Sequence, residues 1–340
     1  MIPASIGVIA NPSSGRDIRR LLAWASVFPT HEKVQTVLRL LAPMGRLGVA
    51  EAWMVPDRAG IAQRVREEAA DAVRRGVPMP AVRLIDMAVI DGPGDSAAAA
   101  GWLRARGAAL IAVLGGDGTH RAVASHCGSV PLATLSTGTN NAFPDRREAT
   151  LVGMAAALAA TGRVPAEVSL SANKVLHVRG AGVDERALVD VGVSREPWLG
   201  ARAVGDGGTL SELFASFAEP KVIGLSSIAG LLHPVARSEP CGVHVRFGAG
   251  QRLWAPILPG ALEAVSVAAV ETMHPGEPVR LPAGQGTLAL DGEREIEFDT
   301  GAGLSVELRL DGPRTLAVEA TLAHAARHGL LVDGAEPNAG

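Results

Sequence analysis

This sequence lacks the short motifs that would assign an enzyme class directly. It has two cysteines, Cys127 and Cys241, which lie far apart and form no CxxC pair, so neither a disulfide framework nor a structural zinc site is indicated. The histidines are scattered without the spacing of metal ligands. There is no G-x-x-x-x-G-K-[ST] loop and no G-x-S-x-G elbow. These absences exclude a P-loop kinase and give no support to a serine hydrolase or a zinc enzyme.

An excess of one charge sign and long apolar runs are also missing. The formal net charge is −3, and the basic residues do not cluster, which argues against nucleic-acid or anionic-membrane partners. No stretch approaches the roughly 18 apolar residues of a membrane span. The first residues, MIPASIGVIANP, have no basic region, and their apolar run is too short for a signal sequence. We therefore expect a cytoplasmic protein with no nucleic-acid or membrane partner.

The first half of the chain alternates short apolar runs with helical patterns. This alternation predicts a parallel sheet covered by helices on both faces. The expected strands are Ile6–Ala10, Val49–Val55, Val82–Ile90, Ala108–Leu114 and Pro131–Leu135. The expected helices are His31–Leu41, Ile61–Arg75, Ser96–Arg106 with Asp95 as its N-cap, Gly118–Ser125 and Thr150–Ala160.

After about Pro165 the pattern changes to short β-rich segments separated by Gly, Pro and Asp turns, which predicts an antiparallel-dominated second domain. The expected strands are Lys174–Arg179, Arg186–Ser194, Val243–Phe247, Ala264–Val270, Gly286–Leu290 and Leu304–Leu310. A helix is expected at Val318–His328, packed back onto the first domain. We thus expect an α/β protein with a three-layer parallel-sheet domain at 1–163, a β-rich domain at 164–315, and a returning helix and tail at 316–340.

The strongest functional signal is LGGDGT, Leu114–Thr119, between a buried strand and a helix. In open α/β sheets, ligands bind at the carboxyl ends of the strands, where helix N-termini present free N–H groups. Gly115, Gly116 and Gly118 let the backbone approach a polyphosphate closely. Asp117 adds one carboxylate, which beside an anionic ligand could contact a metal or act as base for an incoming hydroxyl. The alternative is a tight turn in which Asp117 caps the helix.

Two further loops make phosphate binding the better interpretation. NPSSG, Asn11–Gly15, follows the first expected strand, and STGTNN, Ser136–Asn141, follows the strand after GGDGT. Both loops are rich in glycine, hydroxyl groups and small side chains, as a phosphate cradle requires. Three such loops at one edge of a sheet are hard to explain as turns alone.

The ordered strings NPSSG, GGDGTHRAVA, STGTNNAFP, REPWLGARAV and IGLSSIAG resemble the NAD kinase-like superfamily, which includes NAD kinases and diacylglycerol- and sphingosine-type lipid kinases. Within it, the chain most resembles the acetoin catabolism protein X branch. The resemblance implies an NAD kinase-like fold with a β-sandwich-like second domain. It also implies a kinase that uses ATP or polyphosphate with Mg²⁺ and phosphorylates a nucleotide hydroxyl such as the 2′-OH of NAD. Because NAD kinase relatives are commonly oligomeric, a homo-oligomer is expected.

The resemblance also implies residue roles. Asp117 becomes the base or orienting group for the acceptor hydroxyl. The residues implied for the ATP phosphates are Asn11, Pro12, Ser13, Ser14, Gly15, Gly115, Gly116, Gly118, Thr119, Gly138 and Thr139. Those implied for the acceptor are Asn140, Asn141, Asp190, Ser226 and Ser227. No protein ligand for the metal is assigned.

Several positions depart from the family pattern. Val189 stands where NAD kinases have an Asn that grips the adenosine, which puts NAD as substrate in doubt. Asp190 keeps the neighbouring acid, although an outward-facing strand residue is an equal alternative. Asp291 and Glu293 in LDGE resemble a late lipid-kinase motif, but a D-G hairpin turn is slightly favoured. His120 and Arg121 could add positive character near phosphates, or each could be a solvated helix residue.

Two other functions remain open at this stage. NPSSG and LDGE favour a lipid or small-polyol kinase, whereas the absence of Asn–Glu after GGDGT counts against it. Val189 and the absence of tyrosine favour a non-catalytic nucleotide-binding protein linked to acetoin catabolism. GPGDSA at 92–97 fits a G-x-G-x-x-A dinucleotide pattern, but we interpret it as the beginning of a helix.

Overall fold

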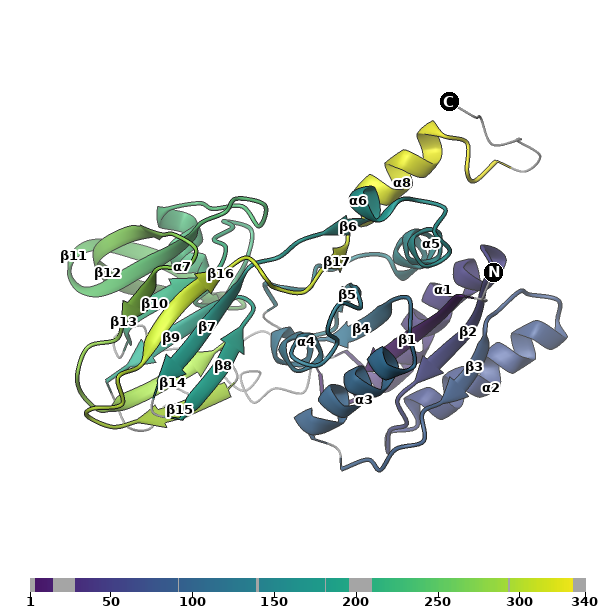
Figure 1. Cartoon of the computed structure of the whole chain (residues 1–340), viewed down its shortest axis with the longest axis horizontal. Helices are drawn as coiled ribbons and strands as arrows, with labels where there is room; N and C mark the ends of the chain where they lie inside the picture. Colours follow the sequence, from purple (N-terminus) through teal and green to yellow (C-terminus); the bar gives the residue numbers. More distant parts are fainter. Residues whose placement is uncertain are drawn as a thin grey trace.

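The structure is a computed structural model of the chain that describes residues 4–14, 28–90, 92–138, 141–180, 182–195, 210–292 and 294–332. Two units lie side by side, an α/β unit and a β-rich unit (Figure 1). The α/β unit is built on a seven-stranded sheet in the order β3-β2-β1-β4-β5-β17-β6. Its strands are β1 Ala4–Ala10, β2 Val49–Met54, β3 Ala81–Leu84, β4 Ile111–Gly115, β5 Leu132–Ser136, β6 Leu170–Ser171 and β17 Thr315–Leu316.

The pairs from β3 through β5 to β17 are parallel, and β6 pairs antiparallel to β17. One face of the sheet is covered by α1 (Thr30–Arg46), α2 (Ile61–Arg74) and α5 (Ala149–Ala160), whose apolar residues form one core with the strands. The other face is covered by α3 (Pro93–Ala105) and α4 (Asp117–Ala124) through a second core. The predicted three-layer architecture is confirmed.

The β-rich unit consists of two antiparallel sheets. The six-stranded sheet has the order β12-β11-β10-β9-β14-β15 and the four-stranded sheet the order β13-β16-β7-β8. Their bounds are β7 Val175–Gly180, β8 Val183–Ala187, β9 Asp190–Ser194, β10 Leu210–Ala215, β11 Gly242–Leu258, β12 Ala261–Met273, β13 Pro278–Arg280, β14 Gly286–Leu290, β15 Arg294–Phe298 and β16 Ser305–Arg309. A buried cluster from both sheets, including Val178, Val193 and Val306, joins them as a sandwich. The short helix α7, Ser226–Leu232, packs on β10 and β11.

The chain crosses between the units twice. It leaves the α/β unit after α6 (Ala166–Ser169) and β6, and it returns through β17 and the last helix, α8 (Val318–Arg327). Val318 and Leu322 of α8 pack into the core of the α/β unit beside α5 (Figure 1). The prediction that the final helix returns to the first part of the chain is confirmed.

The predicted strands Val243–Phe247 and Ala264–Val270 are parts of the longer β11 and β12, and two other predicted strands are shortened or divided. The predicted strand Val82–Ile90 ends at Leu84, because its partner strand β2 ends at Met54. The last backbone hydrogen bond between the two segments runs from Ile85 N to Met54 O at 2.9 Å. Arg186–Ser194 is divided into β8 and β9. Its middle residues do not continue a ladder, because their amide groups bind a side chain that is described below.

The beginning of α3 also differs from the prediction. Its N-cap is Gly92, and Pro93 occupies the first turn, where a proline has no amide to leave unsatisfied. Asp95 lies inside the first turn and accepts from Ile90 N at 3.1 Å and from Gly92 N at 3.4 Å. The aspartate therefore binds the preceding loop and is not the N-cap. The interpretation of GPGDSA as the beginning of a helix is confirmed.

Candidate functional site

Three loops meet at the carboxyl edge of the parallel sheet, as expected from their places after β1, β4 and β5. Asn11 in the first loop donates from Nδ2 to Thr119 Oγ1 of the GGDGT segment at 2.8 Å. Ser14 in the first loop shares a hydrogen bond of 2.8 Å with Thr137 Oγ1 in the third. These contacts join segments that are more than 100 residues apart in sequence, so the three loops form one polar cluster.

Asp117 connects the second loop to the third. It is buried, and its carboxylate accepts from Ala142 N at 3.2 and 3.0 Å and from Phe143 N at 2.9 Å. It is the first residue of α4, whose N-cap is Gly116 with no side-chain capping bond. The alternative that Asp117 caps its own helix is therefore wrong.

Two glycines of this cluster lie close to neighbouring side chains. A Cβ on Gly115 would lie 2.5 Å from the Thr119 Cβ, well inside van der Waals contact. A Cβ on Gly138 would lie 2.6 Å from Oδ1 of Asn141. Asn141 itself donates from Nδ2 to Ser136 Oγ at 2.7 Å. Asn141 thus stabilises the third loop by an internal hydrogen bond. This contact differs from its predicted role in acceptor binding.

A buried lysine that the sequence analysis missed holds the first loop. Lys33 of α1 donates from Nζ to the carbonyl oxygens of Asn11 and Pro12 at 2.9 Å and of Ser14 at 2.8 Å. Its side chain lies on the same helix face as the core residue Val37. The signal that could have revealed it is a lone lysine at an apolar position of an amphipathic helix.

A cavity of about 620 Å³ adjoins two of the loops. Of the predicted residues it is lined by Asn11, Pro12, Ser13, Gly118 and Thr119. Its other lining residues include Gly94 and Ser96 at the beginning of α3 and Glu185 of β8, which were not predicted as site residues, and Arg121 of α4, for which positive character near phosphates was one expectation. Because Glu185 belongs to the β-rich unit, this cavity is shared by both units.

Other predicted residues lie elsewhere. Gly138 lines a separate cavity of about 210 Å³ together with Thr137, Arg39 and Arg147. Among the described residues, neither Gly138 nor Asp117 lines the larger cavity. Gly15, Thr139, Asn140 and the REPWLGARAV segment beyond Arg195 lie outside the residues that the structure describes.

His120 and Arg121 follow the GGDGT motif but behave differently. His120 is fully buried, and its Nδ1 lies 2.8 Å from Gly116 O. Burial, the largest cause, lowers the pKa of His120 from 6.5 to about 4, so the ring is neutral at pH 7 and adds no charge near a phosphate. The solvated-residue alternative is equally wrong. Arg121 reaches the β-rich unit, where it donates to Leu290 O at 3.1 Å and lies 3.8 Å from the Asp291 carboxylate.

Asp291 explains the break between β8 and β9. It is in the D-G turn of the β14–β15 hairpin with φ of 51°, which confirms the hairpin interpretation of LDGE. Its buried carboxylate also accepts from the amides of Leu188 at 3.2 Å, Val189 at 2.8 Å and Asp190 at 3.3 Å. Burial, the largest cause, raises the pKa of Asp291, against the opposing effects of Arg121 and these amides.

Asp190 and the two serines of α7 come together. Asp190 is buried, so the outward-facing alternative is wrong, and its Oδ2 accepts from Ser226 N at 3.1 Å. Ser226 and Ser227 are also buried, and the Ser227 hydroxyl donates to Gly224 O at 2.6 Å. None of these three residues lines the 620 Å³ cavity in the described part of the chain. The side chain of Val189 is buried, and its amide is taken by Asp291.

The described residues contain no helix that is long and apolar enough to cross a membrane. They also contain no group of three His, Cys, Asp or Glu side chains arranged to hold a metal ion.

Comparison with known proteins agrees with this fold. Residues 6–164 match the ATP-NAD kinase N-terminal domain, which places the α/β unit in the NAD kinase-like class. Residues 174–311 match the acetoin catabolism protein X C-terminal domain. Acetoin catabolism protein X of Cupriavidus necator (strain ATCC 17699) is 43% identical over 343 residues, covering 98% of this chain and 96% of that protein. The chain therefore belongs to the acetoin catabolism protein X family.

Similar solved structures are two from Bacillus anthracis str. Sterne, both described provisionally as a diacylglycerol kinase. One has a TM-score of 0.46 at 12% identity and covers 93% of this chain and 98% of its own. The other has a TM-score of 0.43 at 13% identity, with 93% and 99% covered.

Proposed function

We propose that this chain is a phosphotransferase of the NAD kinase type, which transfers a phosphoryl group from ATP, or from polyphosphate, to a nucleotide hydroxyl such as the 2′-OH of NAD. The observation that carries the proposal is the position of Asp117. Its carboxylate joins the second loop to Ala142 and Phe143, which follow the third, and it lies in the first turn of α4, whose next residues Gly118 and Thr119 line the 620 Å³ cavity. The match to the ATP-NAD kinase N-terminal domain supports the same class of reaction.

The larger cavity has the composition of a phosphate site. Its volume falls within the roughly 300–1,000 Å³ of small-molecule pockets. Asn11 and Ser13 offer polar groups, the free N–H groups at the beginning of α4 favour anions, and Arg121 adds a positive charge. Gly115 supplies the tight turn that a larger residue would block. These residues would hold the donor phosphates.

The donor set fits a magnesium ion that is carried mainly by the nucleotide. Mg²⁺ is commonly bound through one or two carboxylates together with substrate phosphates. No protein cage of three acidic or histidine ligands gathers in the described residues, while Asp57, Asp95 and Glu185 line the cavity singly. When bound, the ion would neutralise charge on the transferring phosphoryl group.

Asp117 would orient the acceptor hydroxyl and take its proton. The amides of Ala142 and Phe143 hold the carboxylate between the second loop and the segment that follows the third. These amide bonds also fix the carboxylate in one orientation, which lowers the cost of bringing it into line with the acceptor. The group is thus held in one place for that role.

A second acceptor class is favoured by the surroundings of Val189. In this structure that position offers no side-chain amide, and its backbone N–H is bound to Asp291. A site without a side-chain amide at this position lacks one hydrogen bond that could bind the adenosine of NAD. The alternatives are therefore a lipid or small-polyol kinase, or a non-catalytic nucleotide-binding protein linked to acetoin catabolism.

The test is incubation of the purified protein with Mg-ATP and NAD, followed by a cycling assay for NADP, with Asp117→Asn in parallel. We expect the unaltered protein to form NADP and the variant to be at least about 100-fold slower, because the base is lost. Parallel arms replace ATP by polyphosphate, or NAD by lipid micelles or small polyols.

Each other outcome has a defined meaning. Equal rates for the unaltered protein and a folded Asp117→Asn variant would contradict the mechanism. Turnover only with lipid or polyol would select the second acceptor class. Tight ATP binding with no turnover on any acceptor would select the non-catalytic function.

A further inference from the structure

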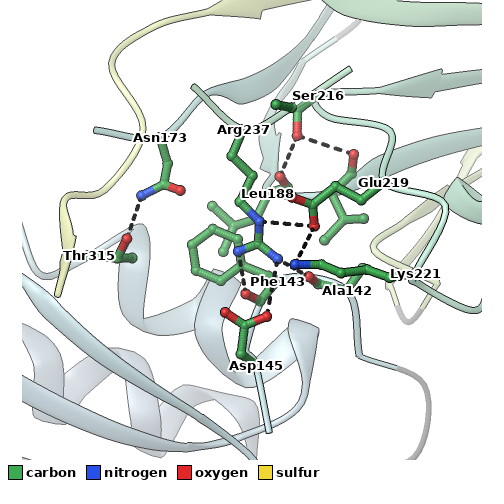
Figure 2. A network of polar contacts seen from close by, with 12 residues as sticks. Ala142, Phe143, Asp145, Asn173, Leu188, Ser216, Glu219, Lys221, Arg237 and Thr315 are labelled. Atoms are coloured by element: carbon green, nitrogen blue, oxygen red, sulfur yellow. Dashed lines mark hydrogen bonds and ion pairs between the residues drawn. The ribbon is translucent and has the colours of Figure 1, made fainter. Parts of the chain in front are cut away.

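The dipeptide Ala142–Phe143, which directly follows the third loop, is hydrogen-bonded from two sides. Arg237 lies in the β-rich unit, between α7 and β11, and its Nη1 donates to Phe143 O at 2.7 Å (Figure 2). Its Nη2 donates to Ala142 O. The same two residues donate their N–H groups to Asp117. Arg237 and Asp117 therefore hold opposite sides of one dipeptide.

Arg237 is itself fixed by its surroundings. Its guanidinium lies 3.5 Å from the Glu219 carboxylate and 3.9 Å from that of Asp145. The group also lies over the ring of Phe143, 5.7 Å from its centroid (Figure 2). It lies 4.4 Å from the centroid of the Phe217 ring. Two carboxylates and two aromatic faces leave the guanidinium little freedom to turn. Its hydrogen bonds can thus define where the dipeptide lies.

We propose that Arg237 is a positioning residue, which sets the place of the Asp117 carboxylate by holding Ala142 and Phe143 from the opposite side. The inference rests on the proposed function, because it matters for turnover only if Asp117 acts on the acceptor. Arg237 does not line the cavity of the phosphate loops within the described residues. It should therefore affect the chemical step more than binding of the phosphoryl donor.

The planar guanidinium is central to this role. Its N–H groups form a rigid fork that can reach two neighbouring carbonyl oxygens at once. A lysine keeps the positive charge between Glu219 and Asp145 but has a single nitrogen on a flexible stem. Arg237→Lys therefore keeps the positive charge but loses the two-pronged donor. Arg237→Gln loses the charge but keeps a neutral N–H donor.

The experiment compares Arg237→Gln and Arg237→Lys with a matched control, Arg246→Gln, which removes an exposed arginine from β11 of the same unit. Two quantities are measured: steady-state kcat and KM for ATP, and hydrogen exchange of the Ala142 and Phe143 amides by NMR. For Arg237→Gln we expect kcat to fall by about 10- to 100-fold with little change in KM for ATP, since misplacement of a reacting group costs rate. Exchange at both amides should accelerate by about 10-fold or more, because their segment opens more often.

The variants and controls make every outcome decisive. Compared with Arg237→Gln, Arg237→Lys should recover more of the thermal midpoint than of kcat. If Arg237 contributed only a structural charge, the lysine would recover both to the same extent. Unchanged kcat and unchanged exchange in a folded Arg237→Gln variant, or equal effects in Arg246→Gln, would overturn the proposal. If the unaltered protein transfers no phosphoryl group, the proposed function fails, while exchange of the two amides still decides whether Arg237 holds the segment.

Discussion

Two buried aspartates, one in each unit, have nearly the same local chemistry. Asp117 in the α/β unit accepts from the amides of Ala142 and Phe143, and Asp291 in the β-rich unit accepts from three successive amides beginning at Leu188. Both follow a buried strand and both precede a glycine. A carboxylate bound to backbone amides is therefore not by itself a mark of an active site.

The difference lies in what surrounds each carboxylate. Asp117 is at the carboxyl edge of a parallel sheet and at the beginning of a helix, where polar loops adjoin a cavity. Asp291 is in a hairpin turn, and its remaining partner is Arg121, which reaches across from α4. Topology thus separates the group that we propose for chemistry from a group that holds a strand break and ties the two units together.

The comparison predicts that the same substitution has opposite consequences at the two positions. Asp291→Asn should lower the free energy of unfolding by about 3–5 kcal/mol, because Arg121 loses its buried partner and the Leu188 amide faces a donor. Asn tolerates the positive φ, so the turn itself is not strained. Asp117→Asn should cost about 1 kcal/mol or less, since Oδ1 can still accept from both amides. Urea unfolding measures both changes.

Turnover should follow the reverse order. Asp291→Asn, corrected for the folded fraction, should keep a rate close to that of the unaltered protein, whereas Asp117→Asn should lose it. If Asp117→Asn proved as destabilising as Asp291→Asn, the two aspartates would both be structural and the contrast would be lost.

The next largest effect on stability concerns His120, which lies in α4 three residues after Asp117 and next to the Phe143 ring. Above pH 6.5 the histidine is neutral in the folded and unfolded states, so its contribution to stability is complete. Below pH 6.5 the unfolded state takes up a proton first, because burial holds the folded-state pKa at about 4. Stability should therefore fall by about 1.4 kcal/mol per pH unit in this window, or about 2 kcal/mol between pH 6.5 and pH 5.

His120→Asn should remove this part of the pH dependence, whatever it costs at pH 7.5. Urea unfolding at pH 7.5 and pH 5 measures the difference. His126→Asn is the control, because His126 lies just beyond the same helix and is exposed. A slope that persists in His120→Asn would mean that His120 is not the group that titrates.

The sequence was sufficient to predict structural features that are determined by residues close together in the chain. Apolar runs and turn residues were enough for the strands from β1 to β5, the helices that cover them and the three loops, because parallel strands bring their carboxyl ends to one edge. The short elements β6, β17, α6 and α7 were not predicted. The D-G turn at Asp291 was predictable for the same reason. The break at Leu188 was not, because the carboxylate that causes it lies 103 residues away.

The missed residues share this non-local character. Arg237 lies in an irregular loop, and its partners are backbone carbonyls 94 and 95 residues away, which carry no sequence signal. Arg121 itself was considered, but its pairing with Asp291 in the other unit was missed. Lys33 was the exception, since a lysine on an apolar helix face could have been noticed. Side chains that bind distant backbone can be found only once the fold brings that backbone to them.

An exposed carboxylate completes the comparison and has the smallest expected effect. Glu319 of α8 pairs with Arg147, but its side chain is 76% exposed. Solvent screens such a pair, and Arg147 keeps a second partner in Asp145 at 2.9 Å. Glu319→Gln should therefore change the free energy of unfolding by less than about 0.5 kcal/mol and leave turnover unaltered. Urea unfolding of this variant beside Asp291→Asn measures the contrast. A loss as large as that of Asp291→Asn would show that pairing across elements, and not burial of the carboxylate, determines the cost.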